Sequence, residues 1–288
     1  MKNLVTAAKA RLCFLLMQKP IPYLKFGKFK AQMQQAQLMF NQIVYQRHHL
    51  QFDKQRCVVY EFNPNGYRKA LVVHGWMSRS AHMVMHIQLL IEQGYHVYAI
   101  DLPAHGESKG QLLSWRNAVK ALLQAQVTFG PFAVALGHSF GGGMLVNATA
   151  ISHLMDDIDG VFHADKMVLL ASALSIQVPI TMFSKLARLN EVQTRRFSEL
   201  IAQDAQLELA QMSGLSLQTH YPSQTDFLLI HGVQDGVVSI EESRAFAMLG
   251  PQVKLVEIEQ LNHVGVLYQQ QVFDQITRFL TDSTRHCP

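Results

Sequence analysis

The feature that most constrains the fold is an alternation that begins at Arg56. From this residue onward, short apolar runs recur along the chain, and longer segments with the apolar spacing of helices separate them. The runs are Cys57–Phe62, Ala70–His74, His96–Asp101, Phe132–Gly137, Met167–Ala171, Phe227–His231 and Val253–Ile258, and the helical segments occupy 80–93, 115–129, 140–154, 240–248 and 267–281. Runs such as Leu71-Val72-Val73 are apolar at every position, as in a parallel sheet covered on both faces. The alternation therefore predicts an α/β fold with a doubly wound, mostly parallel sheet.

Composition excludes several other classes of protein. Of the 288 residues, 49% are hydrophobic and 16% are charged, against about 25% charged in an average soluble domain. This balance indicates a large buried core and excludes a mainly disordered chain. The net charge of +4 includes no run of like charges of the kind that marks a nucleic-acid surface, so we expect no nucleic-acid partner.

Cysteine usage argues against a disulfide framework and against a metal site. Cys13, Cys57 and Cys287 are an odd number of cysteines at wide spacing, with no CxxC pair among them. Neither a set of disulfides nor a zinc site follows from such a pattern. A reducing, cytoplasmic location and a function without metal or cofactor are therefore expected.

Two segments fall outside the alternation. Residues 1–55 have helical spacing with a glutamine-rich middle and are expected to form an N-terminal helical extension. Residues 174–224 contain helical patterns without a convincing strand, and an insertion of this kind after a strand predicts a helical cap. Residues 56–173 and 225–288 would then make up the α/β core.

Residues 1–18 begin like a signal peptide, but Lys9 and Arg11 interrupt the apolar stretch. No segment of the chain reaches the roughly 18–20 apolar residues that a membrane-spanning helix needs. Two interpretations stay open. The favoured one is a helix docked on its own domain or on a sister subunit; the other is an amphipathic helix on a membrane surface, with Lys2, Lys9 and Arg11 near anionic headgroups.

The strongest local signal is Gly137-His138-Ser139-Phe140-Gly141, which lies between an apolar run and a helical segment. A serine at such a junction occupies a strained turn, and the flanking glycines allow the strand and the helix to pack closely. The helix that follows directs its free N–H groups toward the reaction centre, where they stabilise an oxyanion. This arrangement predicts that Ser139 is a catalytic nucleophile.

A serine nucleophile needs a general base and a carboxylate that orients the base, in the chain order Ser, acid, His. Asp235 follows the run that ends at His231, and His263 follows the run that ends at Ile258. Both therefore lie at carboxyl ends of predicted strands, where open parallel sheets build their sites. Asp226 and Asp274 are alternative acids, but the first precedes its strand and the second lies inside a helical segment.

Four further histidines lie close to these motifs. His74 and His231 end buried strands and are expected to be structural, hydrogen-bonded residues. His105 and His138 are expected to shape loops rather than to abstract protons.

The oxyanion requires two donors, one of which is the backbone N–H of Phe140, the residue after the nucleophile. The other should come from the loop after an early strand, and the Trp76 backbone N–H is the candidate there. The Trp76 indole either lines an acyl pocket or packs in the core.

The chain resembles the α/β-hydrolase superfamily, in particular its bacterial esterase-like members. The motifs that carry the resemblance are His74-Gly75-Trp76, the loop Asp101 to Ser108, Gly137 to Gly142, Asp235 and His263, and they span roughly residues 56–282. Ala104 stands where relatives usually have glycine. The resemblance implies that the cap covers the nucleophile and shapes the acyl or alcohol pocket. Haloalkane dehalogenases and epoxide hydrolases on this fold carry aspartate at the position of Ser139, which argues against both activities.

The function expected from these residues is cofactor-independent hydrolysis of a carboxylic ester or thioester through an acyl-enzyme. Apolar residues of the cap suggest an apolar pocket for a short- to medium-chain acyl group: Ile180, Met182, Phe183, Leu186 and Leu189. The alternatives are a non-catalytic ligand-binding protein of the same fold and a lipase or lysophospholipase that uses residues 1–18 at a membrane surface. The oligomeric state stays open.

Overall fold

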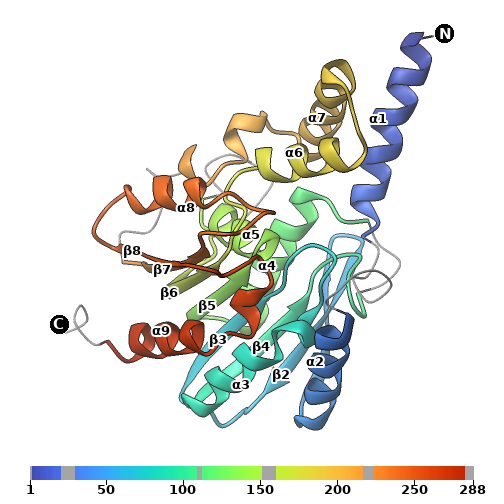
Figure 1. Ribbon diagram of the computed structural model, residues 1–288. Coiled ribbons are helices and arrows are strands. Elements are labelled where there is room, and N and C mark those ends of the chain that lie inside the picture. The colour runs from blue at the N-terminus through green and yellow to red at the C-terminus, as the bar shows by residue number, and fades with distance from the viewer. Residues whose placement is uncertain (1, 21–29, 109–111, 151–159, 217–223, 283–288) are drawn as a thin grey trace.

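An eight-stranded sheet forms the centre of the protein, and helices cover both of its faces (Figure 1). The computed structural model describes residues 2–20, 30–108, 112–150, 160–216 and 224–282, and the side chains from residue 7 onward. The strands are β1 Gln46–Phe52, β2 Gln55–Phe62, β3 Arg68–Val73, β4 Tyr95–Asp101, β5 Phe132–His138, β6 Ala164–Leu170, β7 Asp226–Gly232 and β8 Val253–Ile258. Their order across the sheet is β1-β2-β4-β3-β5-β6-β7-β8.

The sheet is parallel from β4 to β8 and antiparallel at the other edge. β1 pairs with β2, and β2 with β4, in antiparallel register. β3 lies between β4 and β5, and every pair from β4–β3 to β7–β8 is parallel. The carboxyl ends of the parallel strands therefore meet at one edge, where ligand sites form in sheets of this kind.

The two faces of the sheet carry different helices. The helices are α1 Lys2–Gln18, α2 Lys30–Gln42, α3 Val84–Glu92, α4 Trp115–Phe129, α5 Phe140–Ala148, α6 Gln177–Leu186, α7 Glu191–Ala205, α8 Ile240–Ala247 and α9 Gln270–Thr281. One hydrophobic cluster joins the sheet to α4 and α5, and the other joins it to α2, α3 and α9.

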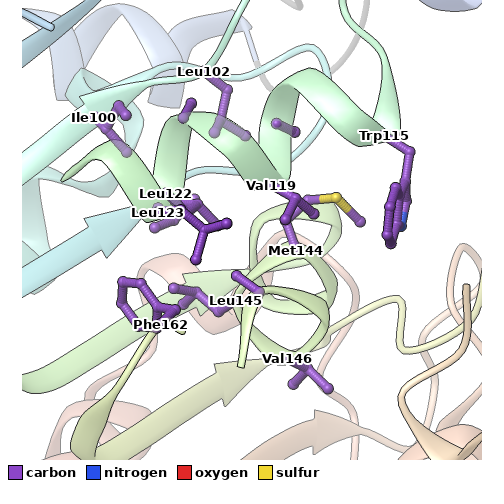
Figure 2. Close-up of a cluster of buried hydrophobic side chains, with 14 of the residues drawn as sticks. Ile100, Leu102, Trp115, Val119, Leu122, Leu123, Met144, Leu145, Val146 and Phe162 are labelled. Atoms are coloured by element: carbon purple, nitrogen blue, oxygen red, sulfur yellow. The ribbon is translucent and has the colours of Figure 1, made fainter. Parts of the chain in front are cut away.

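Strand side chains alternate between these two clusters, which explains the continuous apolar runs. On β3, Leu71 and Val73 belong to the cluster of α4 and α5, whereas Ala70 and Val72 belong to the opposite one. Figure 2 shows the first cluster, in which side chains of α4 such as Leu122 face α5. Complete burial of one leucine of this kind contributes about 1.5–3 kcal/mol to stability.

The strands and helices predicted from Arg56 onward are present, with ends that shift by a few residues. The predicted helix over 80–93 begins as a short 3₁₀ helix, Ser80–Met83, before α3. The part of the predicted helix 140–154 that follows residue 150 lies outside the described residues, as does Cys287.

The prediction that residues 1–55 are helical throughout is wrong at its C-terminal end, where β1 forms. Leu50 and Phe52 of β1 are buried, while most of its other side chains are exposed. β1 pairs with β2 across a turn at Asp53, which has a φ of 47°. The pairing of β1 with β2, and not the polar composition of its first half, determines its conformation.

The predicted cap is helical and consists of α6, α7 and a 3₁₀ helix, Leu209–Gln211. Its two ends are held together, because Gly214 donates a backbone hydrogen bond of 2.6 Å to Leu174 and Ile176 donates one of 3.1 Å to Met212. α1 runs alongside α7 of this cap (Figure 1), so this helix docks on its own chain. Among the described helices, none has the length and apolarity needed to cross a membrane.

The close packing of α5 on the sheet predicts a specific glycine requirement. A Cβ atom at Gly141 would meet the carbonyl oxygen of His74 and lie 2.7 Å from that of Val73. Because these acceptors belong to the sheet backbone, we expect Gly141→Ala to lower the free energy of unfolding by about 1–3 kcal/mol in urea denaturation. Gly236→Ala is the control, since a Cβ there meets no described atom within 4 Å. Equal stability of the two variants would contradict this packing argument.

Candidate active site

Ser139 occupies the turn between β5 and α5 in a strained backbone conformation. Its φ of 52° and ψ of −121° lie in a region that costs a non-glycine residue about 1–3 kcal/mol. Three backbone hydrogen bonds hold the turn: the Ser139 N–H donates to Leu170 at 2.9 Å, and its carbonyl accepts from Gly143 and Ala173, both at 3.2 Å. The strain is thus supported from β6, from α5 and from the start of the cap.

Glycines around the turn bring three backbone segments together. A Cβ at Gly137 would lie 2.6 Å from the Cα of Gly142, so this glycine allows β5 and α5 to approach. A Cβ at Gly75 would lie 3.1 Å from the Cβ of Ser139, so the loop after β3 packs directly against the serine. The predicted role of the flanking glycines agrees with this geometry.

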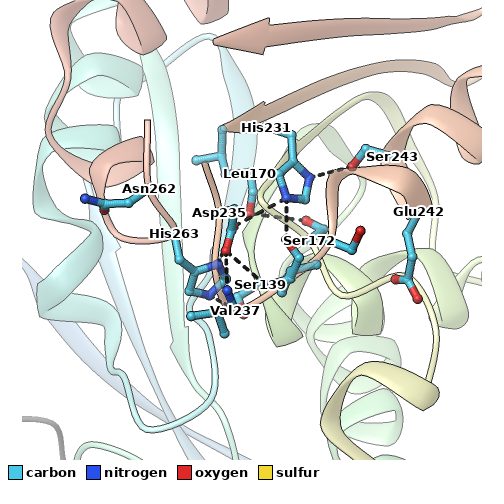
Figure 3. Close-up of polar contacts among 12 residues, drawn as sticks. Ser139, Leu170, Ser172, His231, Asp235, Val237, Glu242, Ser243, Asn262 and His263 are labelled. Atoms are coloured by element: carbon cyan, nitrogen blue, oxygen red, sulfur yellow. Dashed lines mark hydrogen bonds and ion pairs between the residues drawn. The ribbon is translucent and has the colours of Figure 1, made fainter. Parts of the chain in front are cut away.

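The three side chains predicted to act together lie in hydrogen-bonding contact (Figure 3). The Ser139 Oγ is 3.0 Å from Nε2 of His263, and Nδ1 of the same ring is 2.8 Å from Oδ2 of Asp235. With the proton on Nδ1, the ring donates to the carboxylate and accepts from the serine hydroxyl. This is the geometry that a general base requires. The alternative acids, Asp226 and Asp274, have no place in it.

The side chain of Asp235 is buried and has four polar contacts. Oδ1 accepts from the backbone N–H groups of Val237 and Val238 at 2.8 and 3.0 Å. Oδ2 accepts from His263 and lies 3.3 Å from Nε2 of His231. Burial by itself raises the pKa of Asp235, but the hydrogen bonds from the two histidines and from Val238 outweigh it and hold the pKa well below its ordinary value.

His231 is a part of this site that the sequence interpretation assigned only to structure. Its Nε2–H is shared between Asp235 and the carbonyl of Val238, which is 3.1 Å away, and its Nδ1 accepts from the Ser243 hydroxyl at 2.7 Å. It therefore shares Oδ2 of Asp235 with His263 and helps to hold the carboxylate in place. The available signal was its position four residues before Asp235, at the end of the same strand.

His74 is hydrogen-bonded as expected, and His105 and His138 hold loops as expected. His74 donates from Nδ1 to the Gly75 carbonyl and accepts at Nε2 from the Leu102 N–H, at 2.7 and 3.0 Å. A ring that donates once and accepts once is neutral, and burial lowers the pKa of His74 to about 3. His138 donates to the carbonyl of His263 at 3.0 Å and so ties the base to the turn of the nucleophile.

The two predicted oxyanion donors lie beside the serine. Phe140 is the first residue of α5, so its N–H has no acceptor within the helix. Trp76 follows Gly75 in the loop that packs on Ser139, and this loop is held by a 3.1 Å hydrogen bond from the Met77 N–H to His105. Both residues line the same cavity as Ser139.

This cavity, of about 60 Å³, has mostly apolar walls, and residues from several separate parts of the chain form them. Phe14 and Met17 come from α1, and Ile176, Met182 and Phe183 come from the cap. The Trp76 ring also lines the cavity and packs on Phe183 at 4.5 Å between ring centroids, so it has both of the roles that the sequence left open. Asp204 of α7 is a charged member of the lining, and burial raises its pKa.

Three of the five cap residues predicted to line a pocket, Ile180, Leu186 and Leu189, are not part of its lining. Leu186 is 75% exposed at the end of α6, and Ile180 is buried in the core. The spacing of apolar residues on α6 did not reveal which side would face the cavity. The contribution of α1 was also missed, because nothing local in residues 1–18 specifies which distant segment they contact.

Among the described residues, no group of three His, Cys, Asp or Glu side chains could hold a metal ion.

Comparisons with known proteins agree with this architecture. Residues 70–275 match the model of the alpha/beta hydrolase family. An esterase from Pyrococcus furiosus is 17% identical with a TM-score of 0.63, and the match covers 92% of this chain and 97% of that one. Est1E from Butyrivibrio proteoclasticus is 18% identical with a TM-score of 0.60, over 81% of this chain and 97% of its own. A putative lipase from Acinetobacter baumannii is 18% identical with a TM-score of 0.58, over 88% and 96% of the two chains. No curated protein matches the sequence.

The chain therefore belongs to the alpha/beta hydrolase family.

The lowered pKa of Asp235 predicts a pH-dependent contribution to stability. A carboxylate with a depressed pKa stabilises the fold above its unfolded value of about 3.9, and this stabilisation is lost as the pH falls toward the folded value. We expect Asp235→Asn to be less stable than the unmodified chain at neutral pH, and the difference to shrink as the pH falls below about 5. Urea denaturation at several pH values measures it. Asp274→Asn, on the exposed face of α9, is the control, and a pH-independent difference for Asp235→Asn would contradict the argument.

Proposed function

We propose that the protein is a cofactor-independent serine hydrolase that cleaves a carboxylic ester or thioester through an acyl-enzyme. The observation that carries the proposal is the position of the His263 ring, 3.0 Å from the Ser139 hydroxyl and 2.8 Å from the Asp235 carboxylate. The ring can take the hydroxyl proton while the buried carboxylate stabilises the imidazolium that results.

In the first half of the reaction, Ser139 Oγ attacks the carbonyl carbon and His263 accepts its proton. The Phe140 and Trp76 N–H groups bind the oxyanion, and the positive end of α5 adds to this stabilisation. When the tetrahedral intermediate collapses, His263 gives the proton to the leaving alcohol or thiol. Water then attacks the acyl-enzyme with His263 as base again, which releases the acid and restores Ser139.

The walls of the cavity support an apolar acyl group of short to medium length. Ser139 lies in the lining together with Met17, Met182 and Phe183, so an acyl chain bound at the serine would contact thioether and aromatic surfaces. Burial of each methylene of such a chain is favourable by about 0.8 kcal/mol. A charged acyl group would lose its hydration without a matching partner.

A non-catalytic ligand-binding protein of the same fold is the alternative from another class. Such a protein needs a cavity but has no use for a strained serine with an aligned base. The hydrogen-bond chain from Ser139 to Asp235 therefore favours the enzyme.

Covalent labelling distinguishes the serine hydrolase from the non-catalytic ligand-binding protein. We expect a fluorophosphonate probe to modify Ser139, and Ser139→Ala to abolish the label and to reduce kcat for nitrophenyl esters by at least about 10³-fold. The control is Ser172→Ala, because Ser172 is a buried serine that lies close to the same turn. Labelling that persists in Ser139→Ala would disprove Ser139 as the nucleophile.

Acyl-chain selectivity tests the cavity. Met182→Ala removes part of its wall on α6, so we expect the ratio of kcat/KM for a six-carbon over a two-carbon nitrophenyl ester to rise by roughly 10-fold. Leu186→Ala, on the same helix but exposed, should leave the ratio unchanged. If the unmodified chain prefers the shortest, most polar acyl groups, the proposal of an apolar acyl pocket is wrong. The same panel with acyl thioesters compares the two substrate classes.

A further inference from the structure

The N-terminal helix α1 is apolar on two opposite sides. Its inner side packs into the protein: Ala10 and Cys13 are buried, and Phe14 and Met17 line the cavity that contains Ser139. A surface helix usually has a polar outer side opposite such a face. α1 departs from this pattern.

The outer side of α1 presents three leucines to solvent. Leu12, Leu15 and Leu16 are 57, 43 and 51% exposed. Residues three and four apart lie next to each other on a helix, so these side chains form one continuous strip. A single exposed leucine needs no explanation, but a contiguous apolar patch marks an interaction surface.

Four hydrogen bonds keep α1 in this orientation. The Lys9 ammonium donates to the Arg188 carbonyl at 2.9 Å, and the Gln18 amide donates to Asp204 at 3.3 Å. At the C-terminal end, the Trp76 indole donates to the Met17 carbonyl at 3.2 Å, and the Leu113 N–H to the Gln18 carbonyl at 2.9 Å. The inner side is therefore committed to the cap and to the cavity, and the leucines cannot be buried by rotating the helix without breaking these contacts.

Charge is distributed very unevenly along the chain. The first 52 residues contain eight Lys and Arg and no Asp or Glu. The remaining 236 residues contain 17 Lys and Arg against 21 Asp and Glu, a formal charge of −4. Around the leucine strip, the side chains of Arg11 and Lys19 are exposed. Two exposed cationic side chains therefore lie beside the strip.

We propose that the outer side of α1 docks on an anionic lipid layer. The three leucines would enter the boundary between headgroups and acyl chains, and Arg11 and Lys19 would lie among the anionic headgroups. A second copy of the chain fits less well, because pairing two α1 strips would bring Arg11 and Lys19 of both copies close together. The docking itself does not depend on the proposed function. If the protein docks in this way, its substrate would be an ester presented by a lipid layer, and this consequence rests on the proposed hydrolase function.

Vesicle co-sedimentation tests the docking directly. We expect the full chain to bind vesicles of phosphatidylcholine with phosphatidylglycerol more tightly than vesicles of phosphatidylcholine alone, and binding to weaken as salt rises. The combined variant Leu12→Gln, Leu15→Gln and Leu16→Gln should bind the anionic vesicles roughly 10-fold less tightly or weaker. The matched control replaces three exposed apolar residues elsewhere, Leu38→Gln, Val127→Gln and Met248→Gln, and should bind like the unmodified chain.

Equal recovery of the unmodified chain in the supernatant with and without anionic vesicles would overturn the proposal. Equal vesicle binding by the leucine variant would overturn it as well. So would a dimer in solution that the leucine variant converts to a monomer, since the strip would then be a contact between two copies.

A second readout separates this proposal from the proposed function. Fluorophosphonate labelling and hydrolysis of a water-soluble nitrophenyl ester should be unchanged in the leucine variant. Loss of vesicle binding with retained labelling supports the docking surface and the enzyme together. Absence of labelling in the unmodified chain, with vesicle binding intact, would remove the enzyme and leave the docking.

Discussion

The site depends first on the backbone of one residue, Ser139. Its N–H binds the carbonyl of Leu170 at the end of β6, and its carbonyl binds Gly143 in α5 and Ala173 at the start of the cap. A positive φ at a serine is unfavourable on its own, so these three hydrogen bonds must maintain it. They also fix the Phe140 N–H at the start of α5 and the direction in which the chain leaves β6 toward the cap. Ser139, Phe140 and the segment that leads into the cap therefore share one small group of backbone contacts.

The acid and the base are held as firmly, but by side chains. Asp235 accepts hydrogen bonds on both oxygens, so its carboxylate plane has little freedom to rotate. His231 contacts the same carboxylate oxygen as His263, and the backbone N–H groups of Val237 and Val238 hold the other oxygen. His138, next to the nucleophile in sequence, binds the carbonyl of His263 and couples the position of the base to the turn. Under the proposed function, these partners within the protein would supply the pre-organisation that catalysis needs.

The strands of the sheet and the three side chains of the site could largely be predicted from the sequence, for a physical reason. The strands from β2 to β7 are largely buried on both faces, so their apolar runs are strong local signals, and Ser139 and Asp235 follow two of these runs. His263 follows β8, an edge strand that is only partly buried but still has an apolar run. β1 was missed because it lies at the edge of the sheet, where one side of a strand has little to bury and its polar residues resemble those of a helix or loop. The cavity wall from α1 was missed for another reason: Cys13 contacts the Phe183 carbonyl across 170 positions of sequence, and no local pattern specifies such a partner.

α1 has one side in the cavity that contains Ser139 and the opposite side on the surface of the protein. A helix with its side chains is about 10–12 Å across, so Met17 on the inner side and Leu15 on the outer side are separated by roughly that distance. A lipid layer in contact with the leucines would therefore lie about one helix diameter from the cavity. An amphiphilic ester could pass its apolar end from the layer into the cavity along the side of α1 with little exposure to water. Exposing the methylene groups of such a molecule to water is unfavourable. A short path from the lipid layer to the cavity would avoid this cost, and it would therefore favour apolar substrates over polar ones of the same reactivity.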